Sequence, residues 1–391
     1  MDPQTLTQML TDKNTFSFSK LKYKYGKDNF SEYYSLLSDF FYRKIPLKDF
    51  SGNHFVYSPA QVQIISQSLK RLMQDYSGEK YGMKAMEDEI VSTLSIEKIE
   101  TQRESVRRIL EGQAPVSPSE EKAYGIKKAL DFISDPSNRI TAENLNKLYQ
   151  MMINDYLEPE SKLPPGELYR NDSVYIIDSF GQPVHKGLDS EKLSDYVDNL
   201  ILFIDNDSDE IDQVLKSAMI HYYFAYLHPY FDGNGRTARI LQLWYLVQKG
   251  YTSALFIPFS LFVNQKKSVY YKSFKLIAEN TEESKVSDMT PFLYFFTQNV
   301  FSQFENYDVD DDILAEFRAV LESGSVTEKE KDLFYFVLSN YGSAEFSTKD
   351  LEKDFRNVAY ATVRTFVLKF EELGLLKSQK YGARTKYRIH D

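Results

Sequence analysis

The sequence predicts a mainly α-helical protein, with one β-hairpin inserted into the helical body and a separate small unit at the C-terminal end. Three observations support this fold class. Apolar residues recur at helical spacing up to about Phe304, a stretch rich in Pro and Gly interrupts them between Leu163 and Leu188, and the pattern changes again after an acidic segment that begins at Glu305. With 391 residues, of which 42% are hydrophobic, the chain is long enough for two or three domains.

The composition excludes several classes of site. The chain has no cysteine, which rules out a disulfide framework, a thiolate zinc site and a cysteine nucleophile. No apolar run reaches the roughly 18 residues that span a bilayer, and the N-terminus lacks the basic-then-apolar order of a signal peptide. We therefore expect a cytoplasmic protein without a membrane partner. The net charge of −10 disfavours nonspecific coating of nucleic acid by the whole molecule.

Four helices are expected before the interruption. The first follows Ser58 as N-cap and Pro59 at the first helical position, and Gly78 marks its end. A second runs through residues 84–100, with apolar side chains spaced along one face. The third and fourth begin near residues 117 and 141, and Thr141 resembles an N-cap.

The interruption at residues 163–188 predicts a short β-hairpin. Its β-branched run VYII is followed by turn chemistry at Asp178, Ser179 and Gly181. A hairpin that projects from a helical body exposes an unpaired edge, which is a liability unless the edge is covered or grips an extended peptide. A plain connecting hairpin is the alternative.

Helices resume at Ser190 and continue to about Phe304. After residue 326 the sequence predicts a helix, a short helix, a longer helix and a basic hairpin, which is the outline of a winged helix-turn-helix. From Tyr341 to Asp391, six Lys and four Arg stand against three Asp and four Glu, a balance of +3, so the rest of the chain is near −13. The expected divisions are an N-terminal helical region at 1–82, a central domain at 83–304, a linker at 305–326 and a winged-helix domain at 327–391.

The stretch HPYFDGNGRTAR, residues 228–239, carries most of the chemistry. Glycines just ahead of a helix start let backbone N–H groups point into a common space, where the helix dipole adds roughly half a positive charge. Arg236 and Arg239, three residues apart, lie on one face of the first turn. Two guanidiniums and a ring of amides suit a polyanion such as a nucleotide di- or triphosphate.

Two further side chains complete this site. Asp232 is suited to hold Mg²⁺ that bridges phosphates, and His228, at the end of the preceding helix, is suited to act as general base near neutral pH. These parts describe the transfer of a phosphorus-centred group to a nucleophile that His228 deprotonates. The alternative is a Gly/Asn turn whose charges face solvent. No Walker-type or dinucleotide-binding glycine motif competes for the phosphates, and His221, on the same helix as His228, is interpreted as structural.

The stretch resembles the HPFx[D/E]GNGRxxR motif of the Fic family, whose members are mostly protein adenylyltransferases. The resemblance covers roughly residues 84–304 and departs at Tyr230, where Phe is usual. It implies a helical Fic core in which His228 deprotonates a Ser, Thr or Tyr hydroxyl and AMP is transferred from ATP. It also implies that Asp232 holds Mg²⁺ on the α- and β-phosphates and that Arg239 meets the γ-phosphate. The residues that it implies to cradle the phosphates are Gly233, Asn234, Gly235 and Arg236.

Two other regions fit the same resemblance. Residues 163–188 sit where the family has its flap, which aligns a target segment by β-strand addition. A target protein is therefore the implied partner, and self-modification is a further option. In SVYYKSFKLIAEN, Tyr270 and Tyr271 match a pair of tyrosines in the family and would border the nucleotide, unless one or both belong to the core.

A switch is indicated upstream, within residues 83–112. Thr93 and Glu97 are four residues apart on one helical face, and they resemble the [S/T]xxxE[G/N] inhibitory helix of the family. Lys98 stands where Gly or Asn is expected, so the match is partial. The resemblance implies that Glu97 pairs with Arg239 in the place of the γ-phosphate and switches the enzyme off. The alternatives are an ordinary charged helix face and a Glu97 that positions a water to remove AMP from a modified protein.

A different class of function would act through residues 327–391. In a DNA-binding regulator, the third helix of this unit offers Arg364 and Lys369, while its wing supplies more basic residues for phosphate contacts. These are Lys377, Lys380, Arg384, Lys386 and Arg388. The acidity of the whole chain argues against strong DNA binding, and the same unit would equally serve protein contacts or a homodimer.

Overall fold

The computed structural model describes residues 1–64, 83–159, 162–177 and 183–306, together with residues 316–390 apart from 318, 322, 342–344, 356–357 and 383. The chain forms two compact units, and each has its own description below. The first unit contains residues 1–77 and 88–304, and the second contains residues 78–87 and 305–391.

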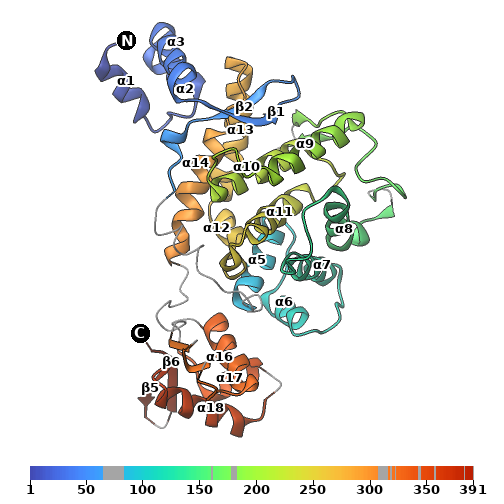
Figure 1. The fold of residues 1–391 in the computed structure, drawn as a ribbon, viewed down its shortest axis with the longest axis vertical. Helices are drawn as coiled ribbons and strands as arrows, with labels where there is room; N and C mark the ends of the chain where they lie inside the picture. Colours follow the sequence, from blue (N-terminus) through green and yellow to red (C-terminus); the bar gives the residue numbers. More distant parts are fainter. Residues whose placement is uncertain are drawn as a thin grey trace. The chain divides into compact units, whose positions relative to one another are not determined.

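Two helices form the centre of the first unit (Figure 1). Helices α10 (Gln213–Leu227) and α11 (Asn234–Gln248) pack against each other and are buried along almost their whole length. Their buried residues lie on all sides, which is typical of helices enclosed in a core. The side chain of Asp212 caps α10 by accepting hydrogen bonds from the N–H groups of Val214 and Leu215. The loop between α10 and α11 is therefore held at both ends by buried helices.

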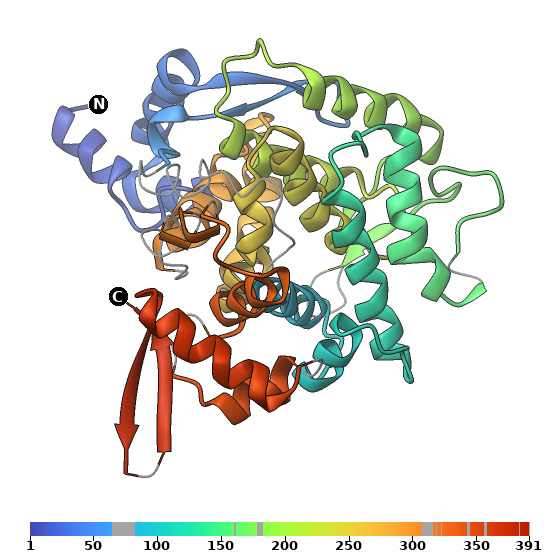
Figure 2. The same cartoon turned by 60° about the horizontal axis from the view of Figure 1, so that its bottom comes forward.

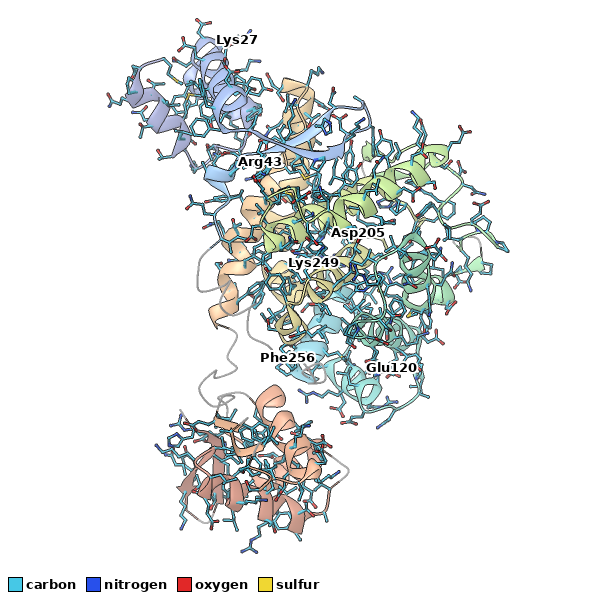
Figure 3. The ribbon with its side chains drawn as sticks, viewed as in Figure 1. Lys27, Arg43, Glu120, Asp205, Lys249 and Phe256 are labelled. Atoms are coloured by element: carbon cyan, nitrogen blue, oxygen red, sulfur yellow. The ribbon has the colours of Figure 1, made fainter. Side chains whose placement is uncertain are left out.

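Further helices surround this pair, and α7, α9 and α14 pack directly against it. They are α5 (Met83–Ile96), α6 (Arg103–Leu110), α7 (Pro118–Ile133), α8 (Ala142–Met152), α9 (Leu193–Asp205), α12 (Phe259–Gln265), α13 (Lys267–Ser284) and α14 (Thr290–Asn299). Thr141 accepts a hydrogen bond from the N–H of Asn144, so the predicted N-cap of α8 is confirmed. Glu120 of α7 is labelled in Figure 3. Its Oε1 lies 3.1 Å from Nη1 of Arg108 on α6. Within the described residues, no helix has both the length and the apolar character needed to cross a membrane.

The predicted β-hairpin is present between α8 and α9. Strands β3 (Tyr175–Ile177) and β4 (Pro183–Lys186) run antiparallel, and Ile176 pairs with His185. The register shifts between Ile176 and Ile177. The predicted turn residues 178–182 lie outside the described part of the chain.

The N-terminal region contains both helices and strands. Helices α1 (Pro3–Leu10), α2 (Phe18–Tyr25) and α3 (Lys27–Leu36) share a small core of their own that includes Met9 and Tyr33. A π-helical turn at Leu37–Phe41 follows.

A second hairpin then joins this region to the helical body. Strands β1 (Arg43–Lys48) and β2 (His54–Tyr57) pair antiparallel, and the sequence pattern did not predict them. Val56 connects the hairpin to the segment before α14: its N–H donates to the carbonyl of Ser287 at 3.0 Å, and its carbonyl accepts from the N–H of Met289 at 2.8 Å. Partners more than 200 residues away in the chain stabilise this hairpin.

The helix predicted to begin after Ser58 starts differently. Residues Pro59–Gln61 make a single 3-10 turn, and Val62 then leaves helical conformation at φ −126°. The Ser58 side chain makes no cap hydrogen bond, while its backbone N–H donates to Thr290 Oγ1 at 2.9 Å. The prediction was wrong at this end because a tertiary contact uses the capping residue, and residues 65–78 of the predicted helix lie outside the described residues.

The second unit has the predicted order of helix, short helix, longer helix and hairpin. Its elements are α16 (Glu328–Asn340), α17 (Thr348–Phe355), α18 (Tyr360–Glu372), β5 (Leu376–Tyr381) and β6 (Arg384–Ile389). The β5–β6 hairpin follows α18, and β5 packs against it (Figure 2). Phe317 packs on Phe334 and Phe370 with ring centroids 4.4 and 6.0 Å away. The core of this unit therefore includes Phe317, a residue expected in the linker.

Candidate active site

His228 ends helix α10 in a left-handed backbone conformation, with φ 52° and ψ 58°. Pro229 follows and cannot continue the helix. The side chain is half-buried. Burial, followed by the positive charge of Arg170, lowers the pKa of His228 to about 4, against the opposing effects of the Ala225 carbonyl, Asp232 and Glu97. The imidazole is therefore neutral at pH 7 and able to accept a proton.

The loop after His228 is closed by Asn234. The amide of Asn234 accepts from the N–H of Tyr230 at 2.9 Å and donates to the Tyr230 carbonyl at 2.8 Å. Gly233 has φ 78°, and a Cβ there would lie 2.7 Å from Ile153 Cγ2, so only glycine fits. The Asn234 side chain thus shapes the loop, and the backbone N–H groups at the start of α11 are the donors that could face an anion.

Asp232 and Arg236 form an ion pair where the loop joins the first turn of α11. Arg236 Nη2 lies 3.1 Å from Asp232 Oδ2, and the Asp232 side chain is 55% exposed. Among the described residues, the buried Arg236 Nε has no hydrogen-bond partner. An unpaired guanidinium N–H at the start of a helix fits a phosphate group.

These residues also suit Mg²⁺ as a companion of the phosphates. Within the described residues, no group of three or more His, Asp or Glu side chains could hold a metal ion alone. Mg²⁺ usually keeps several waters and takes one or two carboxylates together with substrate phosphates. The single exposed carboxylate of Asp232 fits that mode of binding.

Arg239 lies in contact with helix α5. Its Nε donates to Thr93 Oγ1 at 2.7 Å, and its Nη2 donates to the Thr93 carbonyl at 3.2 Å and to Glu97 Oε1 at 2.6 Å. The Arg239 side chain is 3% exposed, against 29% for Glu97. Burial is the largest single effect and disfavours the charged guanidinium, but Glu97, Tyr270 and Tyr271 together outweigh it and raise the pKa of Arg239. The two residues expected to pair are therefore in direct contact.

The close approach of Glu97 also involves Gly235. A Cβ at Gly235 would lie 2.6 Å from Glu97 Oε1 and 3.4 Å from Arg239 Nη1. The carboxylate of Glu97 therefore reaches the turn at the start of α11 itself.

Lys98 explains the partial match of the inhibitory motif. It is left-handed, with φ 60°, directly after the last turn of α5. The N–H of Lys98 donates to the carbonyl of Ser95 at 3.1 Å, and the N–H of Ile99 donates to that of Leu94 at 3.0 Å. This is a Schellman motif, in which Gly or Asn is favoured at the left-handed position. Lysine occupies that position here with some backbone strain.

Three residues that belong to α5 or contact α5 or His228 were missed from the sequence. Glu89, one turn before Thr93, is fully buried and accepts a hydrogen bond from the Ser260 N–H at 2.8 Å. Burial raises the pKa of Glu89. Lys267 Nζ donates to the Ser95 carbonyl at 3.0 Å. The third is Arg170, which lies fully buried behind His228. The four-residue spacing of Glu89 and Thr93 places both on one face of α5 and could have indicated Glu89. The sequence holds no comparable signal for Lys267 or Arg170.

The two tyrosines expected near the nucleotide occupy different environments. Tyr270 is 3% exposed, and its hydroxyl lies 2.9 Å from Nε2 of the buried His221. His221 Nδ1 lies 2.8 Å from Gln242 Oε1, which agrees with its interpretation as structural. Tyr271 is 44% exposed, and its hydroxyl donates to the Ile96 carbonyl of α5 at 3.4 Å.

In the second unit, the basic residues suggested for DNA contact are partly paired. Lys369 Nζ lies 2.7 Å from Glu330, and Lys386 Nζ lies 3.8 Å from Glu345. Arg364 is exposed on α18, and the wing exposes Lys377, Lys380 and Arg384. No described feature of this unit favours DNA over protein as its partner.

Comparison with known proteins bears on the first unit. The sequence profile of the Fic/DOC family matches residues 139–246, which include the motif and the β3–β4 hairpin. Over 88 residues, the chain is 35% identical to the proteins named Protein adenylyltransferase Fic of Drosophila grimshawi and Drosophila willistoni. That stretch is 22% of this chain and only 16% and 15% of the two relatives.

The fold is similar to solved Fic structures. A Fic family protein from Desulfovibrio desulfuricans G20 matches with a TM-score of 0.53 and 18% identity, over 85% of this chain and 96% of that one. Fic-1 from C. elegans matches with a TM-score of 0.53 and 15% identity, over 78% of this chain and 83% of that one. The helical domain with its hairpin and its GNGR turn is thus of the Fic type. Residues 139–246, which carry the motif, are therefore similar in sequence to the Fic/DOC family.

Proposed function

We propose that this protein is a protein adenylyltransferase that transfers AMP from Mg-ATP to a Ser, Thr or Tyr hydroxyl of a target protein or of itself. The observation that carries this proposal is the loop at 228–239, where a neutral imidazole, an exposed carboxylate and two guanidiniums gather at the start of α11. The relatives named as adenylyltransferases support the same reaction.

In the proposed reaction, the target hydroxyl oxygen attacks the α-phosphorus of ATP. His228 takes the hydroxyl proton as the new P–O bond forms, and the bond from the α-phosphorus to the bridging oxygen breaks. Pyrophosphate leaves with that electron pair. The lowered pKa of His228 leaves the imidazole unprotonated at neutral pH before the target arrives.

The phosphates would occupy the turn at the start of α11. Its backbone N–H groups and the free Arg236 Nε would donate to their oxygens, and Arg239 would meet the γ-phosphate. Mg²⁺, held by Asp232, would neutralise charge on the α- and β-phosphates. The β3–β4 hairpin is a two-stranded sheet, and it would align the target segment by adding it as a further strand.

Glu97 would hold this enzyme in an inactive state. Its carboxylate sits on Arg239, the residue that would otherwise bind the γ-phosphate. ATP could still bind through the other contacts, but its α-phosphate would lie out of line with the attacking hydroxyl. A charge-assisted pair on a buried guanidinium competes well with a loosely held phosphate contact.

The test is incubation of the Glu97→Gly protein with labelled ATP, CTP, GTP or UTP and a cell lysate. We expect strong new labelling with ATP, little with the wild type and none with the Glu97→Gly/His228→Ala double variant. Glu100→Gly is the matched control, because it removes an exposed carboxylate three residues away. Equal labelling by the wild type and Glu97→Gly would refute the inhibition. No labelling by Glu97→Gly with any nucleotide would refute the transferase activity.

A further inference from the structure

Arg170 is a buried cation whose hydrogen bonds go to backbone carbonyls. Its side chain is 1% exposed. Nε donates to the carbonyl of His228 at 2.8 Å, Nη1 to that of Asp172 at 2.5 Å and Nη2 to that of Leu188 at 2.5 Å. A buried guanidinium is costly unless its donors are satisfied, so these three carbonyls must stay in place around it.

The three carbonyls belong to parts of the chain that matter for the reaction. Asp172 precedes strand β3 and Leu188 follows strand β4, so Arg170 binds both legs of the hairpin. The third carbonyl is that of His228 itself. The backbone N–H of Arg170 adds a fourth link, because it donates to the Pro229 carbonyl at 2.9 Å.

The base of the hairpin is shaped to admit this side chain. The N–H of Gly187 donates to the Val174 carbonyl at 2.9 Å and closes the hairpin there. A Cβ at Gly187 would lie 2.7 Å from Val174 Cγ2 and 2.9 Å from Arg170 Nη2. A larger residue at this position would therefore displace Arg170 or the neighbouring strand.

We propose that Arg170 is a positioning residue that fixes the hairpin relative to His228. The inference rests on the proposed function, in which the hairpin brings the target hydroxyl and His228 takes its proton. The orientation of the imidazole depends on the left-handed backbone of His228, and Arg170 holds the carbonyl of that same residue. One guanidinium thereby sets the distance between the target strand and the base. Misplacement by about 1 Å in such an arrangement costs roughly 100-fold in rate.

The test compares Arg170→Lys and Arg170→Met in the Glu97→Gly background. Three quantities are measured: the Kd for ATP, the rate of protein labelling with labelled ATP in a lysate, and deuterium exchange at the amides of Gly187 and Arg170. We expect the Kd for ATP to change less than about twofold, while Arg170→Met slows labelling roughly 100-fold. Both amides should exchange faster, and Arg170→Lys should recover part of the rate because an ammonium still donates to carbonyls.

Lys216→Met is the matched control, since Lys216 is also a fully buried cation that donates to a backbone carbonyl, that of Asn206, and to Asp209. This change should lower stability without raising exchange at Gly187 or slowing labelling per folded molecule. If Arg170→Met does not fold, the same three quantities are measured for Arg170→Lys and Gly187→Ala instead.

Two outcomes separate this inference from the proposed function. Unchanged labelling and unchanged exchange at Gly187 in Arg170→Lys and Arg170→Met would overturn the role of Arg170 while the transferase activity stands. If Glu97→Gly itself labels nothing, the proposed function fails, and exchange at Gly187 and Arg170 still decides whether Arg170 anchors the hairpin.

Discussion

Replacing Lys98 by glycine should strengthen the hold of α5 on Arg239. Lys98 occupies the left-handed position of the Schellman motif that ends α5, directly after Glu97. A residue with a Cβ is strained there, and the strain opposes the turn that presents Glu97 to Arg239. Glycine adopts the same backbone without strain.

The size of the effect follows from two opposing contributions. A left-handed non-glycine residue costs roughly 1–2 kcal/mol, while glycine loses about 0.5–1 kcal/mol more in conformational entropy on ordering. The net stabilisation of the inhibited turn is about 0.5–1 kcal/mol. Since 1.4 kcal/mol corresponds to a factor of ten, the population of molecules with a free Arg239 should fall roughly two- to fivefold.

The assay is basal labelling of protein with labelled ATP in two backgrounds. Lys98→Gly should lower labelling roughly two- to fivefold in the wild type and leave it unchanged in Glu97→Gly, where no carboxylate remains to be positioned. Lys98→Ala keeps the Cβ and removes the charge, so it separates strain from electrostatics. If Lys98→Gly and Lys98→Ala reduce labelling equally, or if Lys98→Gly raises it, the reasoning from backbone strain is wrong.

Three further predictions concern stability, measured as the free energy of unfolding in urea. Gly125→Ala should lower the free energy of unfolding by about 1–3 kcal/mol, because its Cβ would lie 2.6 Å from the Met152 carbonyl oxygen. Gly250→Ala is the control: its Cβ meets open space at φ 89°, so only the strain of its left-handed backbone should destabilise the protein. Burial lowers the pKa of His221 to about 3. The stability that the neutral imidazole contributes is therefore present above pH 6.5 and is lost as pH falls toward 3, by about 2 kcal/mol at pH 5. His221→Gln should remove this part of the pH dependence of stability, and an unchanged pH dependence would contradict the argument. Burial raises the pKa of Asp288 to about 6, so its contribution is present below pH 3.8 and is lost as pH rises through 6; Asp288→Asn should flatten the curve between those values.

Features that depend on neighbouring residues could be predicted from the sequence. The N-cap at Thr141 needs only a hydroxyl and an N–H three residues on. The turn at 228–239 needs its glycines and Asn234 in one short segment. The pairing of Glu97 with Arg239 joins residues 142 positions apart, and it was expected only because Thr93 and Glu97 resemble the inhibitory motif of a known family.

Features that depend on distant partners could not be predicted. The β1–β2 hairpin is joined through Val56 to Ser287 and Met289, and no local pattern announces such partners. Arg170 meets the His228 carbonyl across 58 residues, and a lone arginine after a Pro/Gly turn looks like any exposed cation. Both the β1–β2 hairpin and the Arg170 contacts depend on which residues the assembled fold brings together and buries, and a local sequence pattern does not contain that information.

The way α5 is anchored bears on how Arg239 could be freed. Ile90 and Leu94 of α5 are fully buried, and Glu89 is bound at the start of α12. Exposing two such apolar side chains costs roughly 1.5–3 kcal/mol each, before the lost hydrogen bonds of Glu89 are counted. Opening only the Schellman turn that follows Ile96 leaves the side chains of Ile90, Leu94 and Glu89 in place and releases Glu97. The strained residue Lys98 lies directly after Glu97, at the end of α5. The part of this segment that opens at the lowest cost is therefore the part that would release Glu97 from Arg239.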